Sequence, residues 1–260
     1  MDYKIALQTD IGPVKASNQD SMCVKEAFTD QGNVLFAAVC DGMGGLEKGE
    51  LASKTLVEAL DAWFEGELPF LLAEPEPTEA VRESLDALLK QQNRRIGDFG
   101  RANRLQLGST VTAMLILADG SFLIAHVGDS RAYRITDTAL DQLTEDQTVA
   151  AREMRMGRLT AAEAEQDPRR NVLLQCVGAS KTVVPVFVQG KAWPNECYLL
   201  CSDGFRHEIR PAELQETFAP GANGNEALMR RSITDLIERN IQRGETDNIS
   251  AMLIRTIQGD

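Results

Sequence analysis

The sequence predicts an α+β fold in which antiparallel strands form the sheets and the helices lie apart from them. Helical stretches come in pairs between runs of strands, without the steady strand–helix alternation that builds a parallel sheet. An Asp119-Gly120 step between two apolar runs indicates a β-hairpin. Because 43% of the 260 residues are hydrophobic, the chain can bury a large core. We expect a single domain over residues 1–260.

The first part of the chain predicts one strand and two helices. Residues 34–40 are continuously apolar, as in a buried strand. Apolar residues recur in pairs from 51 to 64, which predicts an amphipathic helix. After a surface connection over 66–77, Thr78 is placed to cap a second helix. The buried face of that helix is expected to contain Val81, Leu85, Leu88, Leu89, Gln92 and Ile96.

The remainder predicts strands, a polar segment and a last helix. Strands are expected to form a β-meander over 109–118, 122–127 and 133–135. Residues 149–170 are polar, with a capping-box pattern at Thr160 and Glu163, and suit short helices laid over the surface as a flap. Further strands are expected over 183–188, 197–201 and 249–257. The last helix should end at Gly244 and bury Leu228, Met229, Ile233, Leu236, Ile237 and Ile241.

The charge balance restricts the kinds of partner. A net charge of −12 leaves no surplus of cations to neutralise a nucleic acid or an anionic membrane. No apolar run approaches the roughly 20 residues that cross a bilayer, and no basic-then-apolar leader opens the chain. We therefore expect a soluble cytoplasmic protein with no nucleic-acid or membrane partner. We expect a monomer, because no isolated apolar stripe is left over.

Five is an odd number of cysteines, and three lie within apolar runs: Cys40, Cys176 and Cys201. These are interpreted as buried reduced thiols and not as a disulfide framework. Cys197 and Cys201 could share one strand face as zinc ligands, but His126 and His207 show no paired ligand spacing. Structural thiols are therefore preferred to a zinc site.

Three aspartates follow apolar runs where strands are expected to end: Asp41, Asp203 and Asp247. Taken singly, each is explained by a turn or a helix cap. If the fold brings them together, three carboxylates are costly without a cation, since like charges disfavour ionisation. Carboxylates are also the ligands that hard cations prefer. The pattern therefore predicts a divalent-metal site.

A series of short motifs then identifies a resemblance that covers nearly the whole chain. In order they are Lys15-Ala-Ser-Asn18-Gln19-Asp20, Asp41-Gly-Met-Gly-Gly45, Gly108-Ser-Thr110, Val127-Gly-Asp129-Ser-Arg131, Leu143-Thr-Glu-Asp146, Pro168-Arg-Arg-Asn171, Ser202-Asp203-Gly204 and Thr246-Asp247-Asn248. Together they resemble the metal-dependent serine/threonine protein phosphatases of the PP2C (PPM) type in their compact bacterial form. The resemblance implies a four-layer αββα sandwich, with two antiparallel sheets face to face, helix pairs outside, and the site at one end.

The resemblance also implies a ligand set for two Mg²⁺ or Mn²⁺ ions. Asp41 would bridge both ions and the Gly42 carbonyl would serve one of them. Asp203 and Asp247 would serve the other ion. Asp129 resembles the residue that shares a third, weaker ion with Asp203; otherwise Asp129 ends its strand and pairs nearby. Cellular supply would decide between Mg²⁺ and Mn²⁺, which share ligand preferences.

Two further residues receive roles from the resemblance. Asp20 would orient metal-bound water, unless it only caps the following strand. Lys15 stands where the family has a phosphate-binding arginine, and its point charge should hold phosphate less firmly; otherwise it is a solvated surface lysine. Gln19, Met43 and Gln147 also depart from common family residues. The implied reaction is single-step hydrolysis, in which a water that bridges two metal ions attacks phosphorus.

The implied function is a phosphatase that acts on phosphoserine and phosphothreonine proteins and opposes a serine/threonine kinase of the same cell. The alternatives are a catalytically silent phosphoprotein-binding module of the same fold and a regulator controlled by a partner. The flap has a local positive balance that could attract acidic phosphopeptides, although these arginines could equally solvate its helices or bind backbone carbonyls: Arg152, Arg155, Arg158, Arg169 and Arg170.

Overall fold

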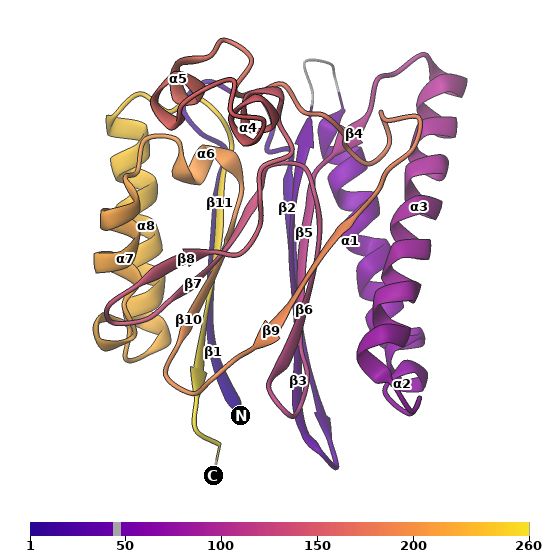
Figure 1. Cartoon of the computed structure of the whole chain (residues 1–260), viewed down its shortest axis with the longest axis vertical. Coiled ribbons are helices and arrows are strands. Elements are labelled where there is room, and N and C mark those ends of the chain that lie inside the picture. Colours follow the sequence, from indigo (N-terminus) through magenta and orange to yellow (C-terminus); the bar gives the residue numbers. More distant parts are fainter. Residues whose placement is uncertain (44–47, 260) are drawn as a thin grey trace.

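The computed structural model describes residues 1–43 and 48–259 and contains two antiparallel sheets packed face to face (Figure 1). The first sheet has the order β1 (Asp2–Asp10), β11 (Ile249–Ile257), β10 (Cys197–Cys201), β7 (Arg131–Ile135) and β8 (Leu140–Gln142). The second has the order β2 (Asp20–Thr29), β3 (Gly32–Met43), β5 (Val111–Ile116), β6 (Ser121–Val127) and β9 (Val186–Lys191), with β4 (Gly108–Ser109) paired to the end of β3.

Helices cover the outer face of each sheet. Against the second sheet lie α1 (Gly49–Gly66), α2 (Leu68–Leu71) and α3 (Pro77–Asn103). Against the first lie α6 (Asp203–Arg206), α7 (Pro211–Phe218), the short 3₁₀ turn η1 (Pro220–Ala222) and α8 (Glu226–Gln242). The order of layers is therefore helix, sheet, sheet, helix, which confirms the predicted α+β sandwich.

Strand β3 explains why the predicted apolar run is continuous and not alternating. Leu35, Ala37 and Val39 face the first sheet and belong to the core between the sheets. Phe36 and Cys40 point the other way and pack under α1 and α3. Since both faces of this strand are buried, every position has to be apolar.

Most expected elements are found, but several details of the expectation were wrong. Leu228 was expected on the buried face of the last helix, but it is 43% exposed near the start of α8. Thr78 does not cap the second long helix, because α3 begins at Pro77 with Glu76 as its N-cap; proline suits the first turn, where its missing N–H is no loss. The meander prediction fails at its third strand. After β6 the chain crosses to the other sheet, where β7 pairs with β10 and β8.

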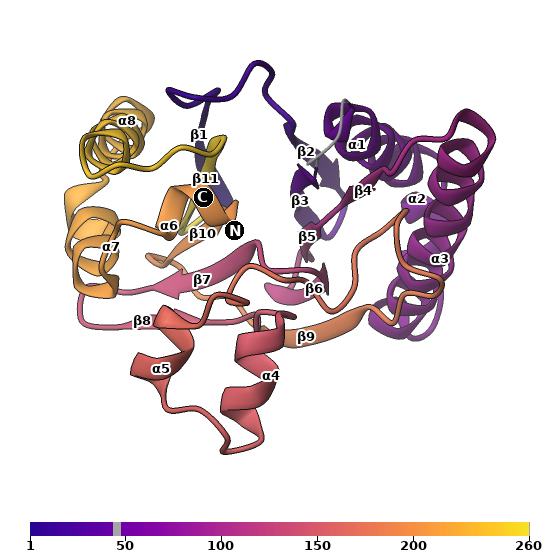
Figure 2. The same cartoon turned by 90° about the horizontal axis from the view of Figure 1, so that it is seen from above.

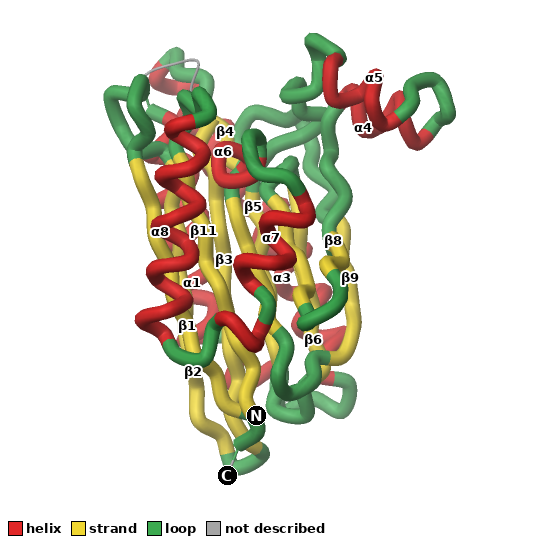
Figure 3. The backbone as a smooth tube through the Cα atoms, turned by 90° about the vertical axis from the view of Figure 1, so that its left-hand side faces the viewer, coloured by secondary structure: helices red, strands yellow, loops and turns green. Residues whose placement is uncertain are grey.

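The flap consists of α4 (Val149–Arg155) and α5 (Ala161–Gln166), which project from the sandwich (Figures 2 and 3). Thr160 and Glu163 form the predicted capping box at the start of α5. All five cysteines are free thiols, as expected. Among the described residues, no helix is both long and apolar enough to cross a membrane.

Candidate metal centre

Five aspartates from separate elements lie at one end of the sandwich, and we call Asp20, Asp41, Asp129, Asp203 and Asp247 the aspartate cluster. Asp20 and Asp41 are direct partners in the register of β2 and β3. Asp203 opens α6 directly after β10, and Asp247 stands two residues before β11. Asp129 lies between β6 and β7, where the chain changes sheets. The fold thus brings together all five acidic residues that the sequence singled out.

Two glycines allow the strand ends to approach this closely. A Cβ atom at Gly42 would lie 2.4 Å from the carbonyl oxygens of Gln19 and Gly49. A Cβ atom at Gly204 would lie 2.2 Å from the carbonyl oxygen of Asn248. Any side chain at these positions would therefore push apart the segments that carry the aspartates. Gly44 and Gly45 of the same motif lie outside the described residues.

The cluster is electrostatically unfavourable as it stands. Burial, reinforced by the charges of Asp20 and Asp203, raises the pKa of Asp41 well above its ordinary value. Burial and the charges of Asp203 and Asp247 raise the pKa of Asp20 to about 7. For Asp129, burial and the charge of Asp203 likewise raise the pKa to about 7. A divalent cation would relieve this strain by favouring the ionised carboxylates.

Asp20 is the acidic side chain whose surroundings satisfy it least. Both of its carboxyl oxygens are buried and accept no hydrogen bond from the described residues. Ser250 and Ser202 are near enough to lower its pKa, against the larger effect of burial. In the structure, however, the Ser250 hydroxyl pairs with Thr9 (2.7 Å) and the Ser202 hydroxyl accepts from the Ser250 amide (3.0 Å). Buried polar oxygens normally have partners, so Asp20 is suited to bind a water or ion.

Lys15 lies directly at the cluster. Its ammonium is 2.6 Å from Asp247 Oδ1, and the side chain is 35% exposed. Burial alone would lower the pKa of Lys15, but the hydrogen bond with Asp247 and the charges of Asp41 and Asp203 raise it. Lys15 is therefore a cation facing the carboxylates, in a position open to a substrate.

Asn248 fixes the segment that carries Lys15 and Asp20. Its side-chain oxygen accepts from the Gln19 amide (2.9 Å). Its side-chain nitrogen donates to the carbonyls of Ile11 (2.8 Å) and Ser17 (3.1 Å). Asn248 belongs to the Thr246-Asp247-Asn248 motif, but the motif alone does not reveal this clamp. Its long separation in the chain, more than two hundred residues from its partners, makes it invisible to local patterns.

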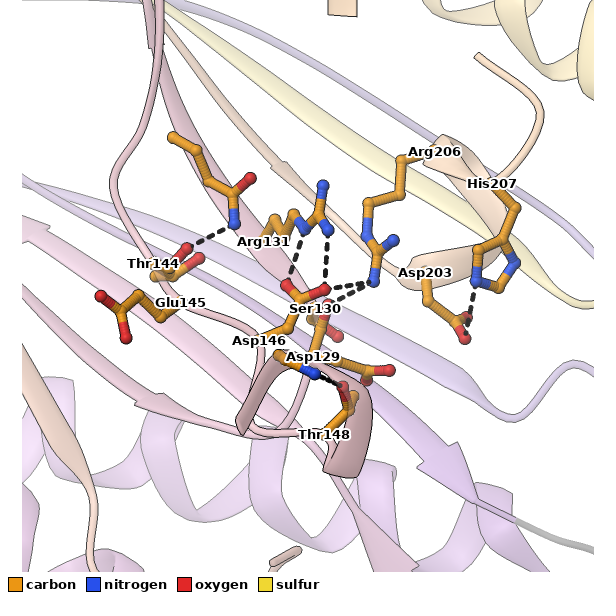
Figure 4. A network of polar contacts seen from close by, with 12 residues as sticks. Asp129, Ser130, Arg131, Thr144, Glu145, Asp146, Thr148, Asp203, Arg206 and His207 are labelled. Carbon is orange, nitrogen blue, oxygen red and sulfur yellow. Dashed lines mark hydrogen bonds and ion pairs between the residues drawn. The ribbon is translucent and has the colours of Figure 1, made fainter. Parts of the chain in front are cut away.

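A second polar network adjoins Asp129 (Figure 4). Arg131 binds both carboxyl oxygens of Asp146 at 2.7 Å, and Arg206 donates to Asp146 (3.2 Å) and to the Asp129 carbonyl (3.1 Å). Burial alone would raise the pKa of Asp146, but the bond from Arg131 and the charge of Arg206 lower it. Asp146 is therefore a structural anion that anchors two arginines beside the cluster.

The carboxylate oxygens of the aspartate cluster have the chemistry that hard cations prefer, but their present positions do not surround an ion. Among the described residues, no three His, Cys, Asp or Glu side chains are placed to hold one ion together. Lys15 engages Asp247, and His207 lies 3.5 Å from Asp203 Oδ2. To enclose an ion, Asp247 would have to turn away from its ammonium partner. Oxygen donors and the excess of buried negative charge nevertheless match the needs of Mg²⁺ or Mn²⁺.

The flap arginines are largely engaged with acidic neighbours. Arg152 and Arg158 both contact Glu153 at 3.0 Å. Arg155 contacts Glu145 at 3.1 Å, and Arg169 contacts Asp167 at 2.8 Å. The positive charge of the flap arginines is therefore mostly neutralised by neighbouring carboxylates.

The fold and the cluster define an α+β sandwich with a cation-seeking site at one end, and comparisons with known proteins agree. The family model for protein phosphatase 2C matches residues 14–253. The serine/threonine phosphatase stp of Listeria monocytogenes is 31% identical over 251 residues, which cover 95% of this chain and 93% of the relative. Protein phosphatase PhpP of Streptococcus pneumoniae is 27% identical over 261 residues, with 99% of each covered.

Solved structures give the same result. Stp1 from Staphylococcus aureus, a serine/threonine phosphatase, has a TM-score of 0.84 at 27% identity, with coverage of 100% of this chain and 96% of that one. The catalytic domain of the phosphatase PstP, in complex with two manganese ions, has a TM-score of 0.78 at 28% identity, with 98% and 99% covered. The chain belongs to the protein phosphatase 2C family. It is a protein phosphatase, as the motifs predicted.

Proposed function

We propose that this protein is a metal-dependent phosphatase that hydrolyses phosphoserine and phosphothreonine in proteins. The observation that carries the proposal is the meeting of five aspartates at one end of the sandwich, where burial and mutual repulsion call for cations. Support for the substrate class comes from the relatives, which are named as serine/threonine phosphatases. Residues 1–260 act as one phosphatase domain, with residues 149–170 as its flap.

In this proposal Asp41, the Gly42 carbonyl, Asp203 and Asp247 hold two Mg²⁺ or Mn²⁺ ions. The pair of manganese ions with PstP supports this number. When bound, the ions supply an ionised water for direct attack on phosphorus and neutralise charge on the phosphoryl oxygens. Asp129 serves a third, weaker ion. That ion has to compete with Arg206 and His207, whose charges both act on Asp129.

The chain's own side chains bind and orient the reactants. Asp20 accepts hydrogen bonds from water, because its buried oxygens accept none from the described residues. Lys15 leaves Asp247 to neutralise the substrate phosphate, a role for which its exposure and its place beside the cluster suit it. The substrates are phosphoproteins made by an opposing serine/threonine kinase. The enzyme acts as a cytoplasmic monomer.

The test is metal-dependent turnover. Hydrolysis of p-nitrophenyl phosphate is measured with Mn²⁺, with chelator, and for Asp203→Asn, then repeated with phosphoserine, phosphothreonine and phosphotyrosine peptides. We expect activity in the presence of Mn²⁺ and none with the chelator. Asp203→Asn should lose nearly all activity, and the phosphoserine and phosphothreonine peptides should be preferred to the phosphotyrosine peptide. Asp235→Asn is the matched control, since Asp235 is a half-exposed aspartate on α8 that pairs only loosely with Arg231 (3.8 Å).

Two results would contradict the proposal. Turnover that survives both the chelator and Asp203→Asn would exclude metal catalysis at this site. Binding of a phosphopeptide without any turnover would favour the alternative function, a catalytically silent phosphoprotein-binding module.

A further inference from the structure

His207 contacts the aspartate cluster from the first sheet's side, and neither metal nor substrate binding as proposed above uses it. It follows the single helical turn α6, four residues after Asp203. Residues four apart in a helix share one face, so the imidazole lies over the Asp203 carboxylate. Its Nε2 atom is 3.5 Å from Asp203 Oδ2 (Figure 4).

The other ring nitrogen leads to the second metal-binding segment. His207 Nδ1 is 3.1 Å from Glu245 Oε2. The second oxygen of Glu245 accepts from the backbone amides of Thr246 (2.7 Å) and Asp247 (2.9 Å). One imidazole therefore links Asp203 on α6 to the loop that presents Asp247, through a single carboxylate.

These contacts are shielded from water. The exposed fractions are 20% for the His207 side chain, 7% for Glu245 and 14% for Asp203. Hydrogen bonds to charged groups in such a setting are stronger and more directional than at the surface. Nδ1 makes a hydrogen bond with Glu245, and Nε2 makes a longer ion-pair contact with Asp203, so the ring contacts both carboxylates at once.

We propose that His207 is a positioning residue that holds the Asp203 carboxylate beside the loop that presents Asp247, so that both segments can serve a divalent cation. The proposal rests on the proposed function, because it assumes that these aspartates are ligands. It resembles the way outer hydrogen bonds orient metal ligands generally, where loss of such a partner costs about 10–100-fold in metal affinity.

Other roles of His207 predict a different change in metal affinity when it is removed. If His207 acted only as a resident cation that competes with the metal, its removal would strengthen metal binding. If it only stabilised the fold, its removal would destabilise the protein without changing metal affinity. The direction of the change therefore distinguishes the three roles.

The experiment measures Mn²⁺ affinity by calorimetry on the full chain after chelator treatment, together with urea unfolding of the same metal-free samples. The variants are His207→Ala, His207→Asn and His207→Gln. An asparagine amide can replace Nδ1 and reach Glu245, whereas a glutamine amide can replace Nε2 and reach Asp203. We expect His207→Ala to weaken Mn²⁺ binding about 10–100-fold. The two amide variants should fall between alanine and the parent, since each restores one contact.

Arg239→Ala is the matched control. Arg239 contacts the buried Glu213 at 3.0 Å, as His207 contacts the buried Glu245, but it lies on α8 away from the cluster. Its loss should leave Mn²⁺ affinity unchanged. The concentration of Mn²⁺ that half-activates turnover should rise in the His207 variants, while turnover at saturating Mn²⁺ recovers most of the parent value.

The outcomes separate the two proposals. If the parent chain binds no Mn²⁺, the proposed function fails. If the parent binds Mn²⁺ and His207→Ala binds it equally well or more tightly, the positioning role alone is overturned. Equal weakening in Arg239→Ala would also overturn it, because a general loss of stability would then explain both.

Discussion

The flap and the aspartate cluster both contain acidic side chains, but these are paired with arginines in the flap and lie beside other carboxylates in the cluster. In the flap, Glu153 is held by two arginines and Asp167 by one, so negative and positive charges cancel within a few residues. In the cluster, Asp20 and Asp41 face other carboxylates, and burial raises the pKa of both. Satisfied charge indicates a structural role. Unsatisfied buried carboxylates indicate a site that favours the binding of cations.

This contrast corrects a simple use of composition. Arginines gathered in one segment of an acidic protein suggest a field that attracts acidic substrates. In the structure, four of the five arginines lie beside a carboxylate, and two of these share Glu153, so little net positive field remains. The cluster has a few cations as well, notably Lys15 and His207, but they do not balance it.

The largest effect is expected from Asp41→Asn. Loss of the ligand that would bridge both ions should lower Mn²⁺-dependent turnover roughly 10³-fold, since ions at such a site supply several kcal/mol. The same change removes one of several repelling buried charges, so the metal-free protein should become more stable by about 1 kcal/mol. Turnover assays and urea unfolding check the two halves. A less stable metal-free variant would show that repulsion does not dominate the cluster.

The next effect is on stability alone. Asp146→Asn leaves Arg131 and Arg206 without their shared anion and should lower the free energy of unfolding by about 2–4 kcal/mol. The pKa of Asp146 is lowered in the folded state, so its contribution is present above the unfolded value of about 4 and is lost as pH falls through the folded pKa. Urea unfolding between pH 3 and pH 7 (roughly the carboxylate range) should show a flatter acid limb in the variant. An unchanged acid limb would contradict this account.

A smaller effect is expected from Lys15→Arg. A guanidinium can bind phosphate through two parallel hydrogen bonds, whereas an ammonium acts as a point charge. The KM for a phosphopeptide should fall about 2–5-fold, since one additional hydrogen bond contributes on the order of 1 kcal/mol net. Steady-state kinetics at fixed Mn²⁺ provide the measurement. A KM that stays constant or rises would remove Lys15 from phosphate binding.

The smallest effect is expected in the flap. The double neutralisation Arg155→Gln and Arg158→Gln breaks an exposed pair with Glu145 and a pair with the largely buried Glu153. Acidic and neutral phosphopeptides should change together, by less than about 2-fold in kcat/KM, because the flap charges already cancel. A selective loss for the acidic peptide would restore the steering hypothesis and weaken the contrast between the two regions.

Local patterns in the sequence were sufficient for many elements. The paired apolar residues of α1, the Asp-Gly hairpin between β5 and β6, and the capping box of α5 all depend on residues close together in the chain. The assignment of β7 to a meander failed because a period of two cannot say which of two sheets a strand joins. Strands β1 and β2 and helix α7 were not assigned from the sequence.

The same division holds at the site. Asp41, Asp203 and Asp247 could be singled out because each follows an apolar run, and the ordered motifs added Asp20, Asp129 and Lys15. The residues that support these side chains could not be identified from the sequence. Asn248 reaches across the molecule to Gln19, and His207 joins Glu245 from 38 positions away. The spacing of residues along the chain does not predict a hydrogen bond between distant loops.

By itself, the sequence determined the fold class, the family and the acidic residues that we assign to the proposed site. Side-chain chemistry and short-range periodicity can be read directly from the order of the residues. Tertiary structure alone decided that these carboxylates meet, that they are buried enough to repel one another, and that most of the flap arginines pair with carboxylates. The physical reason is that burial and charge pairing depend on neighbours in space, and the folded backbone chooses those neighbours.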